Sequence, residues 1–324
     1  LDQAGNIFVT GYTYLGDLGG TNAGGADGII IKLNANSGVL DNVFGDGDGI
    51  GNDNDGIGND NDGIVQLNSS NVSDASDDDW LKDLVLDSSG NCYAAGQSGG
   101  DIGGVNGGFG EDVFVVKLNC NSGVVDTSFG DGDGGLSDGV VQLNAVNTVA
   151  ADRGDSIGAI SIDGAGNIFI VGYAQSGLGG STSSAFVTDG FIAKLSGATG
   201  LLDSQFGDGD GNDNDGIVQV NSTYATDANS NDTIAFLAIK GDNIFITGHT
   251  GSSYGGTRAG GSDAFAMKLD SINGALDNSF GNGDGKDFDG ITLVAPLGSG
   301  DAGGQESINC MDTDGDGNLY AAGE

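Results

Sequence analysis

One short apolar segment recurs five times along the chain at nearly constant spacing. It reads Gly-Asn-Ile-Phe-Val-Thr-Gly-Tyr at residues 5–12. Its copies lie at residues 90–96, 166–173, 242–249 and 317–323. The Asn that all copies share stands at positions 6, 91, 167, 243 and 318, so the period is about 75 to 85 residues. A fixed period of this length indicates stacked copies of one structural unit, each too small to bury its own core.

Three further motifs repeat with the same period. An apolar run that ends in Lys-Leu places its lysines at 32, 117, 194 and 268. A Leu/Val-Asp-x-x-Phe-Gly segment places its phenylalanines at 44, 129, 206 and 280. An Asp-Gly-Ile/Val segment begins at 62, 138, 215 and 289. The first unit is longer because residues 51–57 are duplicated as residues 58–64.

Each unit therefore contains four expected strands. The first strand covers residues 81–87, 156–163, 233–240 and 307–312, and the recurring segments supply the second, third and fourth strands. The third strand is apolar on both faces, as at Ile29, Ile30 and Ile31, and such a strand needs neighbours on both sides of its sheet. No window shows an amphipathic helix with caps. The sequence predicts an all-β fold: a β-propeller-like array of four or more four-stranded antiparallel blades, each of about 75–85 residues.

The repeats divide residues 1–324 into a single expected array. Residues 1–68 hold the second to fourth strands of the first unit, and residues 296–324 hold the first two strands of a fifth. The complete units are 69–144, 145–221 and 222–295. These units do not close neatly into one ring, so we expect a segment of a longer chain. The alternative is that neighbouring copies complete the ends, as in a filament.

The repeated motifs resemble a known family. The segment from Asp2 to Thr13, followed by Asp27-Gly-Ile-Ile-Ile-Lys-Leu-Asn34, is similar to the bacterial SBBP type of β-propeller repeat. The segment from Val39 to Gly45 is similar to the related delta-sixty repeats. The resemblance covers nearly the whole chain and implies an extracellular or cell-surface bacterial protein whose repeats share no catalytic residue. The long acidic insert between the third and fourth strands departs from the family pattern.

The charge balance excludes several partners. The chain has 9 Lys and Arg against 47 Asp and Glu, for a net charge of −38. Nucleic acids and anionic membrane surfaces both need cations that the chain lacks. Because no apolar stretch approaches the 20 residues or so that span a bilayer, we expect no membrane insertion. So much like charge opposes a compact fold unless cations neutralise it.

The acidic inserts predict Ca²⁺ sites. They repeat Phe-Gly-Asp-Gly-Asp-Gly, and alternating Asp and Gly allows carboxylates and carbonyls to converge on one ion. A further run, residues 312–318, resembles the first half of an EF-hand loop without its helices or final Glu. The candidate ligands are Asp46, Asp48, Asp53, Asp55, Asp131, Asp133, Asp208, Asp210, Asp213, Asp215, Asp284, Asp312, Asp314 and Asp316. The alternative is a set of solvated Asp-Gly turns. For Asp2, Asp87 and Asp163, a simple turn is the preferred interpretation.

The remaining chemistry-bearing residues favour structural roles. The one His, His249, has Tyr or Gln at its equivalent positions, so it predicts no catalytic site common to the repeats. The recurring lysines predict a structural ladder paired with acids. Three cysteines cannot all pair within one chain. Cys92 stands where other repeats have Ile, which predicts a core residue rather than half of a disulfide.

These observations favour a non-catalytic extracellular scaffold that is stabilised by Ca²⁺ and self-associates as a homo-oligomer, filament or surface layer. The alternative is an adhesin or carbohydrate-binding propeller, with a glycan or protein ligand at the Gly-rich loops 16–28, 99–110, 177–180 and 255–261. An enzyme is the least favoured class. Strand order also predicts that the acidic inserts share one end of the sheets with the Asp-containing turns, and that the Gly-rich loops lie at the opposite end.

Overall fold

The computed structural model describes most of the chain. The described residues are 1–16, 18, 25–45, 62–67, 78–100, 102, 110–130, 138–143, 154–175, 178, 187–207, 215–220, 230–251, 254, 261–281, 289–294 and 305–324. Every regular element in these ranges is a β-strand, which confirms the all-β prediction. The described part of the chain contains no helix long and apolar enough to cross a bilayer.

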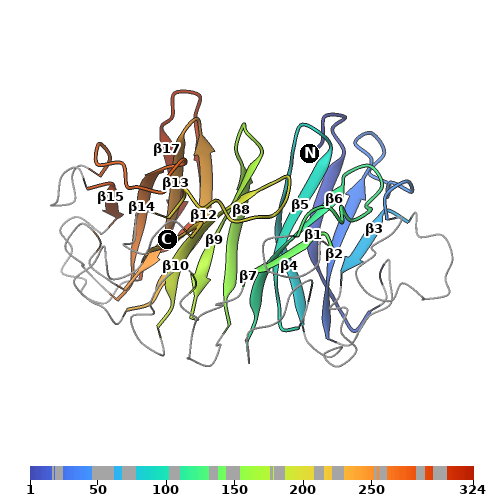
Figure 1. Cartoon of the computed structure of the whole chain (residues 1–324), viewed down its shortest axis with the longest axis horizontal. Helices are drawn as coiled ribbons and strands as arrows, with labels where there is room; N and C mark the ends of the chain where they lie inside the picture. The colour runs from blue at the N-terminus through green and yellow to red at the C-terminus, as the bar shows by residue number, and fades with distance from the viewer. Residues whose placement is uncertain are drawn as a thin grey trace. The chain divides into compact units, whose positions relative to one another are not determined.

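The strands form five antiparallel sheets in chain order (Figure 1). The first sheet is β1 (Ile7–Tyr14), β2 (Ala26–Leu33) and β3 (Ile64–Leu67). The second is β4 (Asp79–Leu86), β5 (Asn91–Ser98), β6 (Asp112–Asn119) and β7 (Val140–Leu143). The third is β8 (Ser156–Ile162), β9 (Asn167–Ala174), β10 (Asp189–Ser196) and β11 (Ile217–Val220). The fourth is β12 (Asp232–Lys240), β13 (Asn243–Thr250), β14 (Asp263–Asp270) and β15 (Ile291–Val294). The last is the hairpin β16 (Ile308–Thr313) and β17 (Leu319–Gly323).

This order confirms the prediction of four-stranded antiparallel sheets with sequential strand order. The strands begin and end within a few residues of the expected limits. The chain divides into two compact units, which we describe separately. Unit 1 comprises Leu1–Val146, Ala151–Ile162 and Ser196–Leu201, and unit 2 comprises Asn147–Ala150, Asp163–Leu195 and Leu202–Glu324.

The recurring Gly of the second strand has a steric cause. The first strand of a repeat contains a register shift, as between Leu81 and Asp83 in β4. There the backbone of β4 comes so close to β5 that a Cβ on Gly96 would overlap the carbonyl oxygen of Trp80. Gly248 has the same relationship to Thr233 in the fourth sheet. Only Gly fits at this close approach, which explains its recurrence in the motif.

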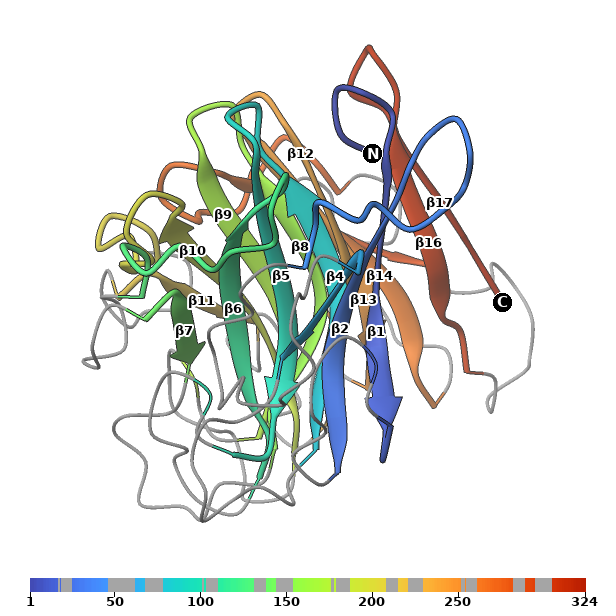
Figure 2. The ribbon, with the colours of Figure 1, turned by 90° about the vertical axis from the view of Figure 1, so that its right-hand side faces the viewer.

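The core of unit 1 lies between successive sheets. In Figure 2, β1 and β2 lie beside β4, and these strands contact one another. Ile30 and Val65 of the first sheet join Cys92, Ala94 and others of the second sheet in one buried apolar cluster. The third strand of the second sheet, β6, is buried over seven consecutive residues. This confirms the prediction that the third strand is covered on both faces.

The predicted lysine ladder is also confirmed. Each lysine at the end of a third strand pairs with the Asp of the Leu/Val-Asp-x-x-Phe-Gly segment that follows it. The Nζ to Oδ2 distance is 3.0 Å for Lys32 and Asp41, and 2.8 Å for Lys194 and Asp203. Each lysine also lies over an aromatic ring of the second strand, at 5.5 to 5.8 Å from its centroid. The ion pair thus anchors the connecting segment to its own sheet.

Candidate functional site

The Asp-containing turns between the first two strands are stabilised by their own carboxylates. Asp87 Oδ1 accepts hydrogen bonds from the backbone N–H groups of Ser89 and Asn91, and Oδ2 accepts one from the Asn91 side chain at 2.6 Å. Asp2 and Asp163 make the same contacts in their turns. The interpretation of these residues as turn formers is confirmed.

Asp314, a candidate Ca²⁺ ligand, occupies the same position in the last hairpin. Its Oδ1 accepts hydrogen bonds from the N–H groups of Asp316 and Asn318, and its Oδ2 accepts bonds from the Asn318 side chain and the Tyr320 hydroxyl. The Asn318 side chain contributes most to holding the pKa of Asp314 below its usual value. Both oxygens thus already serve the turn, as in Asp2, Asp87 and Asp163.

Two other candidate ligands accept hydrogen bonds from the backbone. Asp215 Oδ1 accepts the N–H of Ile217 at 2.9 Å where β11 begins, and Asp312 Oδ1 accepts the N–H of Thr313. The remaining candidates lie outside the described residues: Asp46, Asp48, Asp53, Asp55, Asp131, Asp133, Asp208, Asp210, Asp213 and Asp284. Among the residues that are described, no three His, Cys, Asp or Glu side chains gather as a metal site would require. The Ca²⁺ sites stay a prediction.

A row of buried carboxylates was missed by the sequence reasoning. The Asp that begins each third strand is almost completely buried: Asp27, Asp112, Asp189 and Asp263. A Gln of the fourth strand donates to it in the first three sheets, at 2.7 Å between Gln66 Nε2 and Asp27 Oδ2. The one signal in the sequence was their spacing, because an Asp stands five residues before the Lys of every Lys-Leu segment. The pairing with Gln gives them a structural role in joining two strands.

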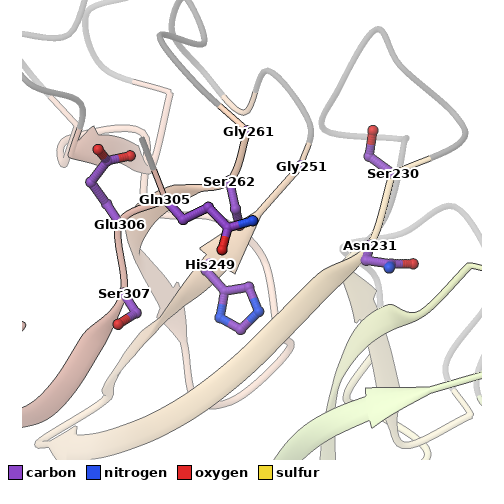
Figure 3. Close-up of a pocket in the computed structure, with 9 residues that line it drawn as sticks. All are labelled: Ser230, Asn231, His249, Gly251, Gly261, Ser262, Gln305, Glu306 and Ser307. Atoms are coloured by element: carbon purple, nitrogen blue, oxygen red, sulfur yellow. The ribbon is translucent and has the colours of Figure 1, made fainter. Parts of the chain in front are cut away.

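A cavity of about 490 Å³ lies in unit 2 (Figure 3). It lies at the start of β12, the end of β13, the start of β14 and the segment that leads into β16. The described lining residues are polar or Gly: Ser230, Asn231, His249, Gly251, Gly261, Ser262, Gln305, Glu306 and Ser307. Figure 3 shows the His249 ring below the side chains of Gln305 and Ser262. This end of the sheet is where the sequence placed the Gly-rich loops.

The His249 imidazole and the charges of the lining residues determine which ligands could bind in this cavity. Burial lowers the pKa of the imidazole, so the ring is neutral at neutral pH and offers one donor and one acceptor. No Lys or Arg is present among the described lining residues, and Glu306 is the one carboxylate there. The site therefore suits a neutral ligand rich in hydroxyl or amide groups better than an anion.

The second repeat fills the equivalent place with its own side chains. Gln97 corresponds to His249, and its Nε2 donates to Glu111 while its Oε1 accepts a bond from Ser156 Oγ at 2.7 Å. This network connects three segments of unit 1. The fourth repeat has His in place of Gln, and a cavity lies beside it. The sequence alone shows this difference between the repeats but indicates no role for it.

The cysteines require a correction. Cys92 and Cys120 form a disulfide, so the prediction that Cys92 is not half of a disulfide is wrong. Both residues are buried, so Cys92 is also the core residue that was expected. Cys120 lies two residues beyond Leu118, the partner of Cys92 across β5 and β6, so the two side chains reach each other diagonally. Cys310 is a free, exposed thiol.

Comparison with known proteins adds no identity. No protein-family model matches the sequence, and no curated protein is significantly similar to it. The class that the structure defines is an all-β repeat protein, and functional inference depends on the geometry described above.

Proposed function

We propose that this chain is a non-catalytic extracellular scaffold built from β-propeller-type repeats of the SBBP kind and stabilised by Ca²⁺. The observation that supports the proposal most is that the recurring polar side chains bond to other parts of the fold. The Lys–Asp pairs, the turn carboxylates and the Asp–Gln pairs all make contacts within the fold. Side chains that recur with a catalytic or ligand-binding purpose would instead converge on an open site.

The contacts between sheets support a propeller-type arrangement. In unit 1 the first strands of successive repeats, β4 and β8, contact each other (Figure 2). In unit 2, β12 and β16 are in contact in the same way. Successive innermost strands of propeller blades have this relationship, since each blade packs face to face on the next.

The disulfide supports an extracellular location. Disulfides persist in oxidising compartments and are rare in the cytosol. Cys92–Cys120 is buried between two strands of a single repeat, where a structural disulfide is expected. The net charge of −38 fits the same setting, because Ca²⁺ at extracellular concentrations would offset the self-repulsion of the acidic inserts.

Thermal unfolding with and without Ca²⁺ tests the scaffold proposal. Binding to the folded state alone raises the melting temperature with ligand concentration, and EDTA should reverse the rise. The double variant Asp208→Asn/Asp210→Asn should reduce the response. The charge-matched control Asp242→Asn/Glu324→Gln changes two exposed acids outside the inserts and should respond as the unmodified chain does. Absence of any shift in millimolar Ca²⁺ would contradict the proposal.

A second candidate function is recognition of a neutral glycan, and the cavity at His249 favours it. The lining residues that the structure describes are polar or Gly and include no Lys or Arg, which matches the hydroxyl-rich surface of a sugar. Titration of neutral oligosaccharides, monitored by the imidazole NMR signals, would test this function. His249→Gln introduces the residue of the second repeat and should abolish binding by filling the site. Oligosaccharides that bind the variant equally well would exclude the cavity as the site.

A further inference from the structure

The cavity beside His249 in the fourth repeat has a filled counterpart in the second repeat. Gln97 and His249 stand at the same position, directly after the Gly that lies close to the first strand. Glu111 and Ser262 also correspond, because each directly precedes the buried Asp that begins a third strand. The second repeat is therefore a template for what the cavity of the fourth repeat can hold.

The backbone around the two places is the same. In the second repeat the Asp155 N–H donates to the Glu111 carbonyl oxygen at 2.6 Å. In the fourth repeat the Glu306 N–H donates to the Ser262 carbonyl oxygen at 2.9 Å. Both bonds use only the segment that leads into the first strand of the following sheet, β8 or β16. The difference between the two places therefore lies in their side chains.

In the second repeat a carboxylate of the chain itself fills the site. Glu111 accepts a hydrogen bond from Gln97 Nε2, and Gln97 Oε1 accepts one from Ser156 Oγ at 2.7 Å. In the fourth repeat Ser262 is much shorter than Glu111, and the cavity of about 490 Å³ is lined by Ser262 and His249. A ligand in this cavity can offer His249 the hydrogen-bond acceptor that Glu111 offers Gln97.

The charges around the cavity favour an acceptor that is neutral. Burial raises the pKa of Glu111, and the charge of Asp78 adds to the rise, so a negative charge is disfavoured even in the second repeat. In the fourth repeat Glu306 contributes a carboxylate, and the described lining residues include no Lys or Arg to balance a second one. The carbonyl oxygen of an amide accepts a hydrogen bond without carrying a charge.

The cavity also offers acceptors for the N–H of such an amide. The side chains of Gln305 and Ser262 lie above the His249 ring in Figure 3, and both contain an acceptor oxygen. The other polar side chains of the lining suit hydroxyl groups: Ser230, Asn231 and Ser307. An amide attached to a hydroxyl-rich ring combines all of these features.

We propose that the cavity binds the acetamido group of an N-acetylated sugar. The acetamido carbonyl accepts a hydrogen bond from the neutral His249 imidazole, and its N–H donates to Gln305 or Ser262. The hydroxyl groups of the sugar bond to the remaining polar lining. This inference rests on the second proposed function, recognition of a neutral glycan, and specifies which class of sugar is recognised.

Calorimetric titration with two matched disaccharides tests the proposal. Di-N-acetylchitobiose and cellobiose have the same linkage and ring configuration, and they differ only in the replacement of hydroxyl by acetamido groups. We expect di-N-acetylchitobiose to bind about tenfold more tightly, because cellobiose leaves the amide partners in the cavity unsatisfied. The imidazole NMR signals of His249 should shift with the acetylated sugar.

Two variants place the side chains of the second repeat in the cavity. Ser262→Glu should weaken binding of di-N-acetylchitobiose at least tenfold, because the new carboxylate takes the place of the acetamido carbonyl. The double variant His249→Gln/Ser262→Glu restores the Gln–Glu pair of the second repeat, so it should keep its melting temperature and also lose binding. Ser204→Glu is the control, because it adds the same charge in an exposed turn outside the cavity and should bind as the unmodified chain does.

The possible results separate this inference from the function on which it rests. Equal affinities for the two disaccharides would overturn the acetamido assignment and retain glycan recognition. Undiminished binding by Ser262→Glu, or equally tight binding of the peptide Gly-Gln-Gly, would overturn the assignment of this cavity to an N-acetylated sugar. Binding of neither disaccharide would reject glycan recognition together with this inference, and would leave the Ca²⁺-stabilised scaffold unaffected.

Discussion

The ammonium of Lys117 lies 2.8 Å from Asp126 Oδ2 and 5.7 Å from the centroid of the Tyr93 ring. Phe129 covers it from another side at 5.9 Å. Lys117 ends the third strand, Asp126 belongs to the connecting segment and Tyr93 to the second strand, so one buried cation joins three parts of a repeat. This lysine is buried in every repeat except the fourth, where it is partly exposed.

Removing this cation should destabilise the fold. Lys117→Met leaves the Asp126 carboxylate without its ion-pair partner, at an expected cost of about 2 to 3 kcal/mol in the free energy of unfolding. A double-mutant cycle with Asp126→Asn, followed by chemical denaturation, measures the coupling. Lys268→Met is the matched control, because its side chain is 19% exposed against 8% for Lys117 and its loss should be smaller. Equal losses at the two positions would contradict this explanation.

The Lys–Asp ion pairs also predict that the fold loses stability in acid. The Lys268 ammonium, with Ser279, lowers the pKa of Asp277 from 3.8 to about 2. A carboxyl whose pKa is lower in the folded state stabilises the fold fully above pH 3.8. That contribution is lost progressively as the pH falls from 3.8 toward 2. Melting temperatures measured from pH 6 to pH 2 should fall less steeply over this window for Asp277→Asn than for the unmodified chain.

The disulfide should contribute to stability independently of the ion pairs. Cys92 and Cys120 are 28 residues apart in the sequence, and closing a loop of this size stabilises a fold by about 3 to 4 kcal/mol. Cys92→Ala/Cys120→Ala should lower the melting temperature, whereas Cys310→Ser should not. Alkylation of the denatured, non-reduced chain should modify one thiol, that of Cys310. Three modified thiols would show that the disulfide is absent.

The positions of the strands could be predicted because four motifs share one period. The double-sided burial of β6 followed from its apolar residues on both faces, such as Phe114 and Val115. The disulfide could not be predicted from the repeats, since it occurs in only one of them. It depends on the diagonal between Cys92 and Cys120, which requires the exact register of β5 and β6.

The sites were harder to predict for three physical reasons. The residue type of Asp27 and its equivalents gives no indication of burial in a chain with 47 acidic residues, because acids are ordinarily exposed; only their fixed spacing from the recurring Lys sets them apart. The contacts between successive repeats use backbone atoms, as where the Gly45 N–H donates to the Ser122 carbonyl. Their signal in the sequence is therefore a Gly such as Gly123, which also fits an ordinary turn. His249 was visible as an exception to the repeat, yet its cavity depends on residues beside the ends of three strands and in the segment before β16.

The two glycines at equivalent positions of the first and second repeats provide a test of the contact that the Gly45 segment of the first repeat makes with the turn at Gly123 of the second. Gly38 and Gly123 both adopt positive φ, so Ala at either position carries the same backbone strain of about 1 to 2 kcal/mol. Gly38→Ala should cost only this amount, because its Cβ meets nothing within 4 Å. Gly123→Ala should cost roughly 3 to 4 kcal/mol, because its Cβ must also displace Gly45 and Val65. Chemical denaturation of the two variants measures the difference.

Hydrogen exchange at the Gly45 N–H, which donates to Ser122, should accelerate in Gly123→Ala alone. Equal destabilisation by the two substitutions would show that the backbone strain, and not the contact between repeats, determines the cost.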